Sequence, residues 1–442
     1  MAPESANVKP LLATPGVLRM HSDKTLVALL AALIALPNSA SAQQSLDSFI
    51  TSSDRNGIDA RSAQAALDTA RSQADEARAR LLPSASAQGT YQRNEFQVEI
   101  MISADRVATI QLYDQLSASF VLNVPILDTT AWASFFAAEQ TADAAEERRD
   151  GAIDDVHAAV VMVWHQVVAA RGMRTAAERN RDVAAASRDA TQARFEAQVA
   201  SQLELSRAEA EVQRALQTYE EANLQVVLSE RNLQNLTGLE PSNEEASLDD
   251  DLHEEAPLDT FMERSDDSPL VRAARHSVRS AELSVDAAWL ALLPTVSGTA
   301  REQITNAAGF APNAQWALLL TGTWQLDFLR PAQIGTRGQQ LASARVQQDL
   351  AAQQSETRIY EQWHRVRSLR AAAAAARAAR DSLARAANDA HLRYDAGSAT
   401  QLEVIQADRD LFQADVMRIQ ADANLRVARY TLRIRSGLDG EQ

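Results

Sequence analysis

The sequence predicts a mainly α-helical protein with a small β part, in which long helical hairpins are joined to four membrane strands. Three observations predict this fold class. The 442 residues include only 14 Gly, 5% aromatic residues and no Cys, and the chain has long stretches rich in Ala, Glu, Gln and Arg, which favours extended helix. An apolar run near the N-terminus is typical of secretion. One pattern of helices and alternating segments occurs twice along the chain.

The first element is a signal peptide, predicted over residues 1–42. Residues 26–36 read LVALLAALIAL, and they follow Lys24 and precede the small residues 40–42, as in secretory signals. Met20 is an alternative start that would give a leader of ordinary length. An uncleaved anchor helix would need about 20 apolar residues. No later run is long enough to span a membrane as a helix, so any membrane part must consist of strands.

The clearest internal repeat aligns residues 194–204 with residues 393–403 at a constant offset of 199. The helices that follow keep the same offset and carry apolar residues every seven positions. A second seam of small residues lies three positions further on. Two heptad seams predict a coiled coil whose helices pack closely side by side. The apolar seam comprises Leu205, Val212, Tyr219, Val226 and Leu233, then Val404, Leu411, Arg418, Leu425 and Leu432, and only Arg418 breaks the apolar row; the small seam comprises Ala208, Ala215, Ala222 and Ser229, then Ala407, Ala414, Ala421 and Ala428.

The strands follow two helix-ending prolines, Pro83 and Pro294. After each proline the hydrophobic period changes to two, which predicts strands over residues 84–92, 116–126, 295–301 and 316–326. A soluble hairpin is the alternative for either pair alone. Lengths of about 10 residues and aromatic residues near the strand ends favour a membrane barrel. Four strands cannot close such a barrel, so several chains must share one.

Two very long helical segments, 129–195 and 332–394, lead away from the strands. At 1.5 Å per residue each would be about 95 Å long. The chain turns back at Gln198 in the first half and at Gly397 in the second. Glycine suits the left-handed conformation that ends helices, whereas glutamine does not. We therefore expect the first turn to be strained or built differently.

Between the halves, residues 238–268 contain twelve acidic residues and one basic residue, Arg264. A solvated linker is the first interpretation, and an irregular layer around the helices is the second. These elements divide the chain into a signal peptide (1–42), a periplasmic helix (43–82), a first β-hairpin with an extracellular loop (83–128), a long helical hairpin (129–237), the acidic equatorial linker (238–268), a second periplasmic helix (269–293), a second β-hairpin (294–328), a second long helical hairpin (329–436) and a tail (437–442).

Composition and motifs argue against several function classes. Lys and Arg number 43 against 59 Asp and Glu, a net charge of −16, so nucleic acid is not an expected partner. Without Cys, thiolate metal sites and cysteine nucleophiles are excluded. The seven His are dispersed, with no HExxH motif, and no Gly-x-Ser-x-Gly elbow occurs. We therefore predict no catalytic residues, no metal site and no cofactor.

Six short motifs, which form three pairs with one member in each half of the chain, carry a resemblance to a known family. Two Leu-Leu-Pro-[Ser/Thr] junctions end the helices at 81–84 and 292–295, and Val-Pro-Ile-Leu-Asp at 124–128 matches Trp-Gln-Leu-Asp at 324–327. The third pair is the two tips that begin Arg194-Phe195 and Arg393-Tyr394. In this order they resemble the TolC-type outer membrane efflux proteins. The resemblance implies a homotrimer in the outer membrane of a Gram-negative bacterium, with a 12-stranded β-barrel continued by an α-helical barrel in the periplasm.

The resemblance also implies a function and its partners. The trimer would be the passive exit duct of a tripartite efflux or type I secretion system, embedded in outer membrane lipid. Its helical tips would dock on a periplasmic adaptor, or membrane fusion protein, and through it on an inner membrane pump of the RND or ABC type. The alternative is a soluble periplasmic coiled-coil adaptor or scaffold. Such a protein would be expected to carry a compact β-rich domain, whereas this chain has two isolated hairpins.

Candidate site residues carry over by position from the family. Glu204 and Glu403 occupy the region where family members charge the periplasmic entrance. In a trimer they would supply six carboxylates around one opening, enough to favour cations; the alternative is two solvated coiled-coil residues. Gln198 and Gln406 depart from the family pattern, which implies looser or differently bonded gating. The candidate adaptor contacts are Arg194, Phe195, Ser201, Arg393, Tyr394, Gly397 and Thr400.

Overall fold

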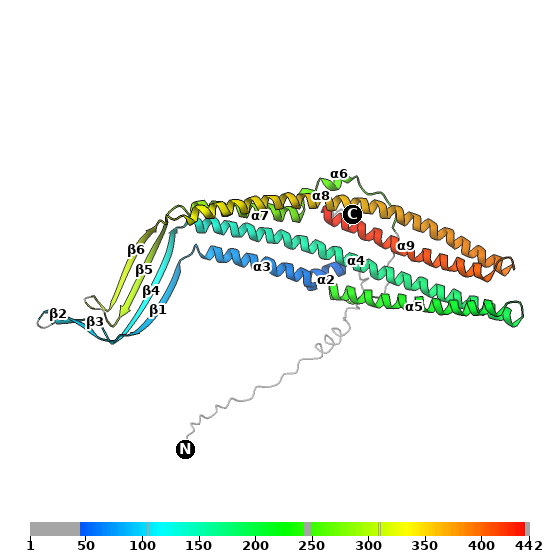
Figure 1. Cartoon of the computed structure of the whole chain (residues 1–442), viewed down its shortest axis with the longest axis horizontal. Coiled ribbons are helices and arrows are strands. Elements are labelled where there is room, and N and C mark those ends of the chain that lie inside the picture. Colours follow the sequence, from blue (N-terminus) through cyan, green and yellow to red (C-terminus); the bar gives the residue numbers. More distant parts are fainter. Residues whose placement is uncertain are drawn as a thin grey trace, which may run out of the picture. The chain divides into compact units, whose positions relative to one another are not determined.

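The computed structural model describes residues 45–103, 106–242, 248, 250–307, 309 and 311–437. The signal peptide predicted at 1–42 lies outside the described residues, as do residues 438–442 of the tail. The described part belongs to one unit, in which long helices run side by side from a β-sheet to two turns (Figure 1). Among the described helices, none combines the length and the apolarity needed to cross a membrane.

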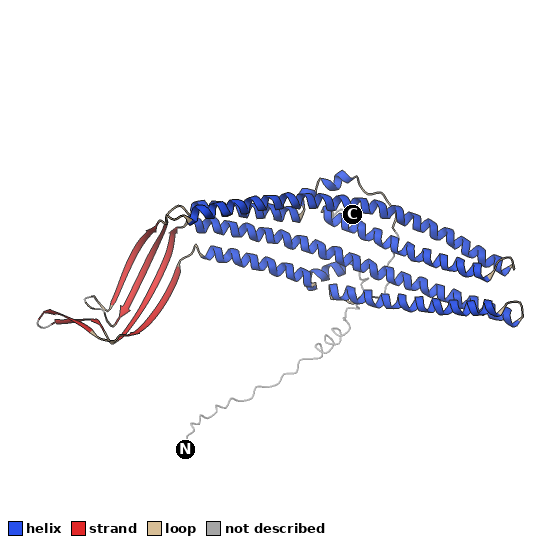
Figure 2. Ribbon diagram, in the orientation of Figure 1, coloured by secondary structure: helices blue, strands red, loops and turns tan. Residues whose placement is uncertain are grey.

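The strands β1 (Ser84–Arg93), β4 (Asp114–Leu127), β5 (Thr295–Thr305) and β6 (Ala314–Thr323) form one antiparallel sheet (Figure 2). Their order is β1-β4-β5-β6. The two predicted hairpins are therefore joined through the pairing of β4 with β5. The outer strands β1 and β6 each pair with one neighbour in the described sheet, so each leaves an edge of backbone groups for another partner.

The register gives the sheet two chemically different faces. One row across the four strands consists of Ala85, Leu122, Ala300 and Leu318. A row on the opposite face consists of Gln88, Ser119, Gln303 and Gln315. Alternation of apolar and polar rows is the pattern of a membrane strand that faces lipid on one side and water on the other. The sequence prediction of a mainly α protein with a small membrane β part is confirmed.

Two details of the β part differ from the prediction. The first connecting loop contains a further antiparallel pair, β2 (Val98–Ser103) and β3 (Arg106–Gln111). The register of this pair shifts at both ends, so its side chains do not follow a clean period of two. Strand β6 ends at Thr323, three residues before the predicted end. Trp324 lies beyond the strand and donates its indole N–H to the carbonyl of Leu292 at 3.0 Å.

The long helices are α4 (Thr129–Glu196) and α8 (Leu329–Asp395), with 68 and 67 residues. An aspartate stands before each of them and explains why the strand gives way to helix there. Asp128 Oδ1 accepts the Ala131 N–H at 2.9 Å. Asp327 Oδ1 accepts the N–H groups of Leu329 and Arg330 at 3.0 and 3.1 Å. Each carboxylate satisfies free N–H groups of the first helical turn.

Shorter helices complete a wall around these two. α3 (Ile58–Ala79) and α5 (Gln202–Thr237) pack on α4, whereas α7 (Pro269–Leu290) and α9 (Gln401–Ser436) pack on both α4 and α8. α2 (Leu46–Asn56) covers α4 near the end of α5. The heptad prediction is confirmed, because the seams bury Leu205, Ala208, Ala215, Val226, Leu233, Val404, Ala414, Leu425, Ala428 and Leu432.

The described part of the acidic segment lies against the outside of α8 and α9. It includes α6 (Leu258–Met262) and the short 3-10 helix η1 (Ser265–Asp267). Phe261 is buried in a cluster with residues of α8 and α9, and the Trp363 indole N–H donates to the Ala256 carbonyl at 2.9 Å. Of the two interpretations of this segment, the structure agrees with the layer around the helices.

Candidate functional site

The first tip is the turn from α4 into α5, and it is built as a Schellman motif. The Val199 N–H donates to the Arg194 carbonyl at 2.8 Å and the Gln198 N–H donates to the Phe195 carbonyl at 2.9 Å. Gln198 itself has φ +60°, a left-handed conformation in which a side chain is costly. Of the two expectations for this turn, strain at Gln198 is the one that the geometry supports.

The second tip, from α8 into α9, has the same hydrogen bonds. Ser398 N–H donates to the Arg393 carbonyl at 2.8 Å, and Gly397 N–H donates to the Tyr394 carbonyl at 3.0 Å. Gly397 has φ +74°. The two turns are thus copies of one structure, and the expectation that the first is built differently is wrong.

Both tips then start their returning helix with a capping box, which sequence reasoning missed. Ser201 Oγ accepts the Glu204 N–H at 3.3 Å, and the Glu204 carboxylate accepts the Ser201 N–H at 2.6 Å. Thr400 and Glu403 make the same pair of bonds at 3.3 and 2.9 Å. The pattern [Ser/Thr]-x-x-Glu before a helix would have revealed both boxes. Each glutamate is therefore fixed on its own tip.

The bonds within the first box also affect charge. Hydrogen bonds from the backbone and the hydroxyl of Ser201 stabilise the carboxylate and lower the pKa of Glu204, with a smaller contribution from the charges of Arg207 and Arg194. Glu204 is accordingly ionised throughout the neutral range. Two carboxylates per chain, Glu204 and Glu403, are held at the start of α5 and α9.

The two tips touch each other within one chain. The Arg194 guanidinium lies over the Tyr394 ring, 4.2 Å from its centroid, and its Nη2 is 3.7 Å from Asp395 Oδ1. Deeper in, the Gln401 amide donates to Thr191 Oγ1 at 2.9 Å, and both side chains are buried. The structure therefore brings together Arg194 and Tyr394 from the predicted set.

The remaining predicted tip residues lie around this contact. Phe195 is half-buried, whereas Ser201, Arg393, Gly397 and Thr400 are exposed. Four large apolar side chains beside them are also exposed, and the sequence analysis did not identify them. They are Val199, Leu203, Leu392 and Leu402. Exposed apolar residues beside fixed carboxylates form a surface suited to a protein partner.

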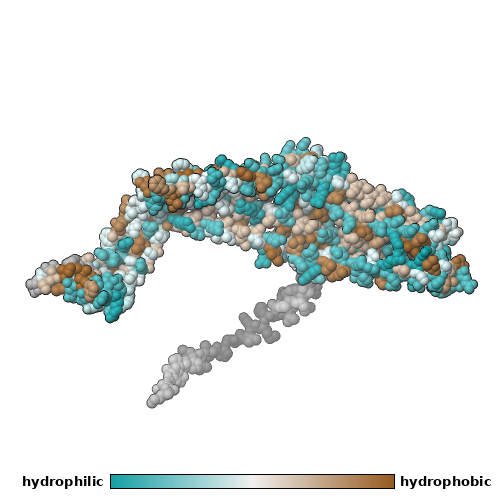
Figure 3. All heavy atoms as spheres, in the orientation of Figure 1, coloured by the Kyte–Doolittle hydropathy of each residue, from teal (hydrophilic) through white to brown (hydrophobic). Residues whose placement is uncertain are grey.

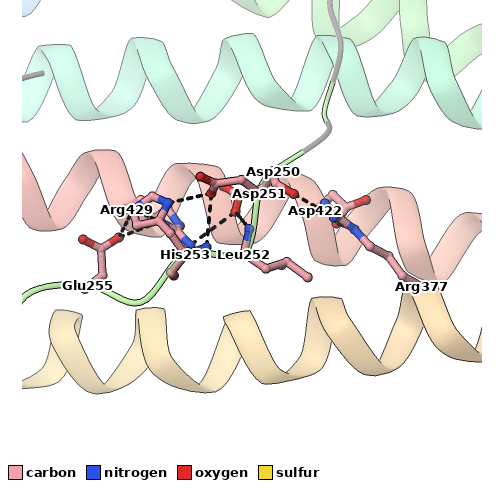
Figure 4. A network of polar contacts seen from close by, with 8 residues as sticks. All are labelled: Asp250, Asp251, Leu252, His253, Glu255, Arg377, Asp422 and Arg429. Carbon is pink, nitrogen blue, oxygen red and sulfur yellow. Dashed lines mark hydrogen bonds and ion pairs between the residues drawn. The ribbon is translucent and has the colours of Figure 1, made fainter.

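Halfway along the wall, the acidic segment is held by arginines (Figure 4). Arg429 is 7% exposed and contacts Asp250 at 3.2 Å and Glu255 at 2.9 Å, and it donates to the His253 carbonyl at 2.8 Å. Further along, the buried Asp422 pairs with Arg377 at 2.9 Å. This network fixes residues 250–255 to α9.

Three side chains of this network could in principle ligate a metal ion. Asp250, Asp251 and His253 hold their ligand atoms within 4.8 Å of one another. However, the Arg429 guanidinium lies against Asp250 and is 2.7 Å from the His253 ring. Its positive charge already stands where a cation would bind, so the cluster is better suited to ion pairing than to metal binding.

A two-faced sheet continued by a wall of long helices that ends in paired turns defines a membrane protein of the duct class. The family described as outer membrane efflux protein matches residues 54–239 and 265–437. This match covers most of the chain, which therefore belongs to the outer membrane efflux protein family. The protein accordingly resides in the outer membrane and extends into the periplasm. The family consists of efflux ducts and is not a family of enzymes.

Solved structures share the fold at low sequence identity. A membrane protein from Pseudomonas aeruginosa is 20% identical with a TM-score of 0.74, over 89% of this chain and 93% of that one. The CmeC outer membrane channel of Campylobacter jejuni is 17% identical with a TM-score of 0.74, over 89% and 85%. The outer membrane protein VceC of Vibrio cholerae is 16% identical with a TM-score of 0.73, over 89% and 96%. No curated protein matches the chain.

Proposed function

We propose that three copies of this chain form the exit duct of a tripartite efflux or type I secretion system, through which substrates pass passively to the exterior. The observation that carries the proposal is the sheet with one apolar and one polar face whose outer strands, β1 and β6, each pair with a single neighbour among the residues that the structure describes. Open edges are not tolerated in hydrocarbon, so copies must pair edge to edge. Three four-stranded sheets would close a 12-stranded barrel of the usual tilt.

The helices extend this barrel into the periplasm. With 68 residues, α4 is about 100 Å long at 1.5 Å per residue. Its far end carries the tips, which are candidates for docking on a periplasmic adaptor and, through it, on an RND or ABC pump. Exposed Val199, Leu203 and Leu402 beside Glu204 and Glu403 support this role for the tips.

The first experiment is purification of the mature protein in detergent, with measurement of its oligomeric mass and of single-channel conductance in a planar bilayer. A trimer that conducts is the expected result. A soluble species without conductance would overturn the duct, because the strands would then not be membrane strands. The soluble adaptor or scaffold would replace it as the function.

The entrance role of the glutamates has its own test. Glutamine also serves at the third position of a capping box, so Glu204→Gln and Glu403→Gln remove charge while keeping the tip structure. The double variant should lower the cation-to-anion permeability ratio of the pore. Glu209→Gln, at an exposed position of α5 further from the tip, is the matched control and should leave the ratio unchanged. Equal ratios in all three proteins would remove Glu204 and Glu403 from the entrance.

Docking of the tips can be tested in the producing bacterium. Leu203→Arg places a charge on an exposed apolar tip residue. Loss of resistance to an exported compound, with trimer mass and bilayer conductance retained, is expected if the tips bind the adaptor. Full resistance in this variant would remove Leu203 from the docking surface.

A further inference from the structure

Four charged residues occur in the strands of the four-stranded sheet, all of whose residues the structure describes. They are Arg93 in β1, Asp114 in β4, and Arg301 and Glu302 in β5. Successive residues of a strand point to opposite faces of the sheet. The register therefore decides which of the four charges lies on the apolar face and which on the polar face.

Three of the four charged side chains belong to the apolar face. Each is an even number of positions away from the residue of its own strand in the apolar row that contains Leu122. Arg93 and Asp114 are register partners and form an ion pair at 3.2 Å, so their charges largely cancel. Glu302 is the register partner of Trp316. The apolar face thus holds both acidic side chains of the four strands.

Arg301 is the one charged residue that these fully described strands place on the polar face. It is two residues from Gln303 of the polar row, and its register partners are Val121 in β4 and Ala317 in β6. Both partners are uncharged and shorter than arginine. The Arg301 side chain is exposed, and it has no hydrogen bond or ion pair with any described residue. No carboxylate of the four strands offsets its charge on that face.

The loop beyond β1 carries exposed charges of the opposite sign. These are Glu95 and Glu99. Further out, hydrophobic residues gather near the end of the hairpin formed by β2 and β3, and they include the exposed Met101 and Val107 (Figure 3). Neither the carboxylates nor the hydrophobic side chains attract an anion. Arg301 thus lies between carboxylates at the outer mouth and carboxylates at the tips.

We infer that Arg301 of three copies forms a ring of guanidinium groups inside the barrel, which attracts anionic solutes and repels cations. This inference rests on the proposed trimeric duct and concerns which solutes pass it most readily. Rotational symmetry places the three side chains at one height. Rings of arginine or lysine are found in pores that favour anions. Guanidinium groups bind carboxylate and phosphate through paired hydrogen bonds, so solutes with these groups are the class that the ring retains.

The width of the barrel decides how far this charge acts. Twelve strands about 4.8 Å apart and tilted by about 40° close a barrel about 24 Å across. The backbone is then about 12 Å from the axis, and the arginine side chain points inward. Its charge therefore lies within about 10 Å of the axis, which is the Debye length at about 0.1 M salt. In about 1 M salt the Debye length falls to about 3 Å, so the ring acts on passing ions only at low salt.

Reversal potentials of single channels across a salt gradient test the ring. Arg301→Gln should raise the cation-to-anion permeability ratio about threefold near 0.1 M salt, and by less than about 1.5-fold near 1 M salt. This change is opposite in sign to the one expected on neutralising the glutamates at the tips. Arg301→Lys keeps the positive charge and should keep the ratio of the natural protein.

Glu302→Gln is the matched control. It removes a charge at the next position of the same strand but on the opposite face of the sheet, so it should leave the permeability ratio unchanged. An unchanged ratio in Arg301→Gln overturns the ring. A change of similar size in Glu302→Gln overturns the assignment of the two residues to separate faces, and the ring with it.

Block by a polyvalent anion tests the binding of phosphate groups without relying on a variant. Inorganic tripolyphosphate should interrupt the current through the natural pore near 0.1 M salt, and about fivefold more of it should be needed to block Arg301→Gln. A natural trimer that conducts but is not blocked, or that is blocked as readily after Arg301→Gln, overturns the ring and leaves the duct intact. A soluble species without conductance overturns the proposed function and the inference together.

Discussion

The Arg194 guanidinium lies 4.2 Å from the centre of the Tyr394 ring, so the two tips of one chain are joined although 200 residues separate them in the sequence. The Arg194 carbonyl accepts the Val199 N–H in the first Schellman turn, and the Tyr394 carbonyl accepts the Gly397 N–H in the second. The side-chain contact therefore connects two turns that are each rigid. It makes the pair of tips one surface.

Removal of the ring should loosen the pair of tips. A cation over an exposed aromatic face contributes about 0.5–1 kcal/mol, so Tyr394→Leu should speed hydrogen exchange of the tip amides by a few fold. Tyr394→Phe keeps the ring and should exchange as the natural protein does. If Tyr394→Phe speeds hydrogen exchange as much as Tyr394→Leu does, the phenol hydroxyl rather than the ring face holds the tips together.

The strained turn predicts a stabilising substitution. Gln198 has φ +60°, a conformation that costs a residue with a side chain roughly 1 kcal/mol. Gln198→Gly should therefore slow exchange of the Val199 N–H, which bonds to the Arg194 carbonyl, by about fivefold. The reciprocal variant Gly397→Gln should speed exchange of the Ser398 N–H by a similar factor. Unchanged rates in both would mean that the left-handed residue does not limit opening of the turn.

The tips show what sequence can and cannot predict here. The offset of 199 revealed both turns, because the same residues recur in the same order. It did not reveal that Gln198 adopts the left-handed conformation of Gly397, because the propensity of glutamine disfavours that conformation. The two hydrogen bonds that close the turn impose it, from the Val199 N–H to the Arg194 carbonyl and from the Gln198 N–H to the Phe195 carbonyl. The contact of Arg194 with Tyr394 depends on how two hairpins pack, which no local pattern records.

Buried His165 predicts loss of stability in acid. Burial, with a smaller effect of the Arg426 charge, lowers the pKa of His165 to about 4, whereas the unfolded value is near 6.5. The unfolded state therefore binds the proton more readily, and stability falls as pH drops from about 6.5 to about 4. The full loss is about 3 kcal/mol, which should appear as a lower urea midpoint at pH 4 than at pH 7.

Two variants separate this effect from general acid sensitivity. His165→Phe removes the titrating group and should reduce the difference between the midpoints at pH 7 and pH 4. His157→Gln, in the same helix with its ring bonded to Asp54 at 2.7 Å, retains His165 and should keep that difference. An identical pH dependence in His165→Phe would assign the acid sensitivity to other groups.

The β part was predicted in outline because its period of two is local. Rows such as Ala85, Leu122, Ala300 and Leu318 follow from alternation once the strands pair. β2 and β3 escaped prediction because their register shifts break the alternation. The position of the acidic segment could not be predicted from the sequence, for a different reason. Its charges suit solvent equally well, and contacts with side chains of α8 and α9 that are distant in sequence, such as Trp363 and Arg429, decide that it is bound.

That arginine network gives the last prediction. Arg429 is 7% exposed and pairs with Asp250 and Glu255, so Arg429→Met leaves two partly buried carboxylates without their partner, at a cost of about 3–5 kcal/mol. Residues 250–256 should detach from α9 and become sensitive to limited proteolysis. Arg370→Met breaks only the pair with Glu254, which is 80% exposed, and should cost less than about 1 kcal/mol. Equal resistance to protease in both variants would mean that Phe261 and Trp363 hold the segment without Arg429.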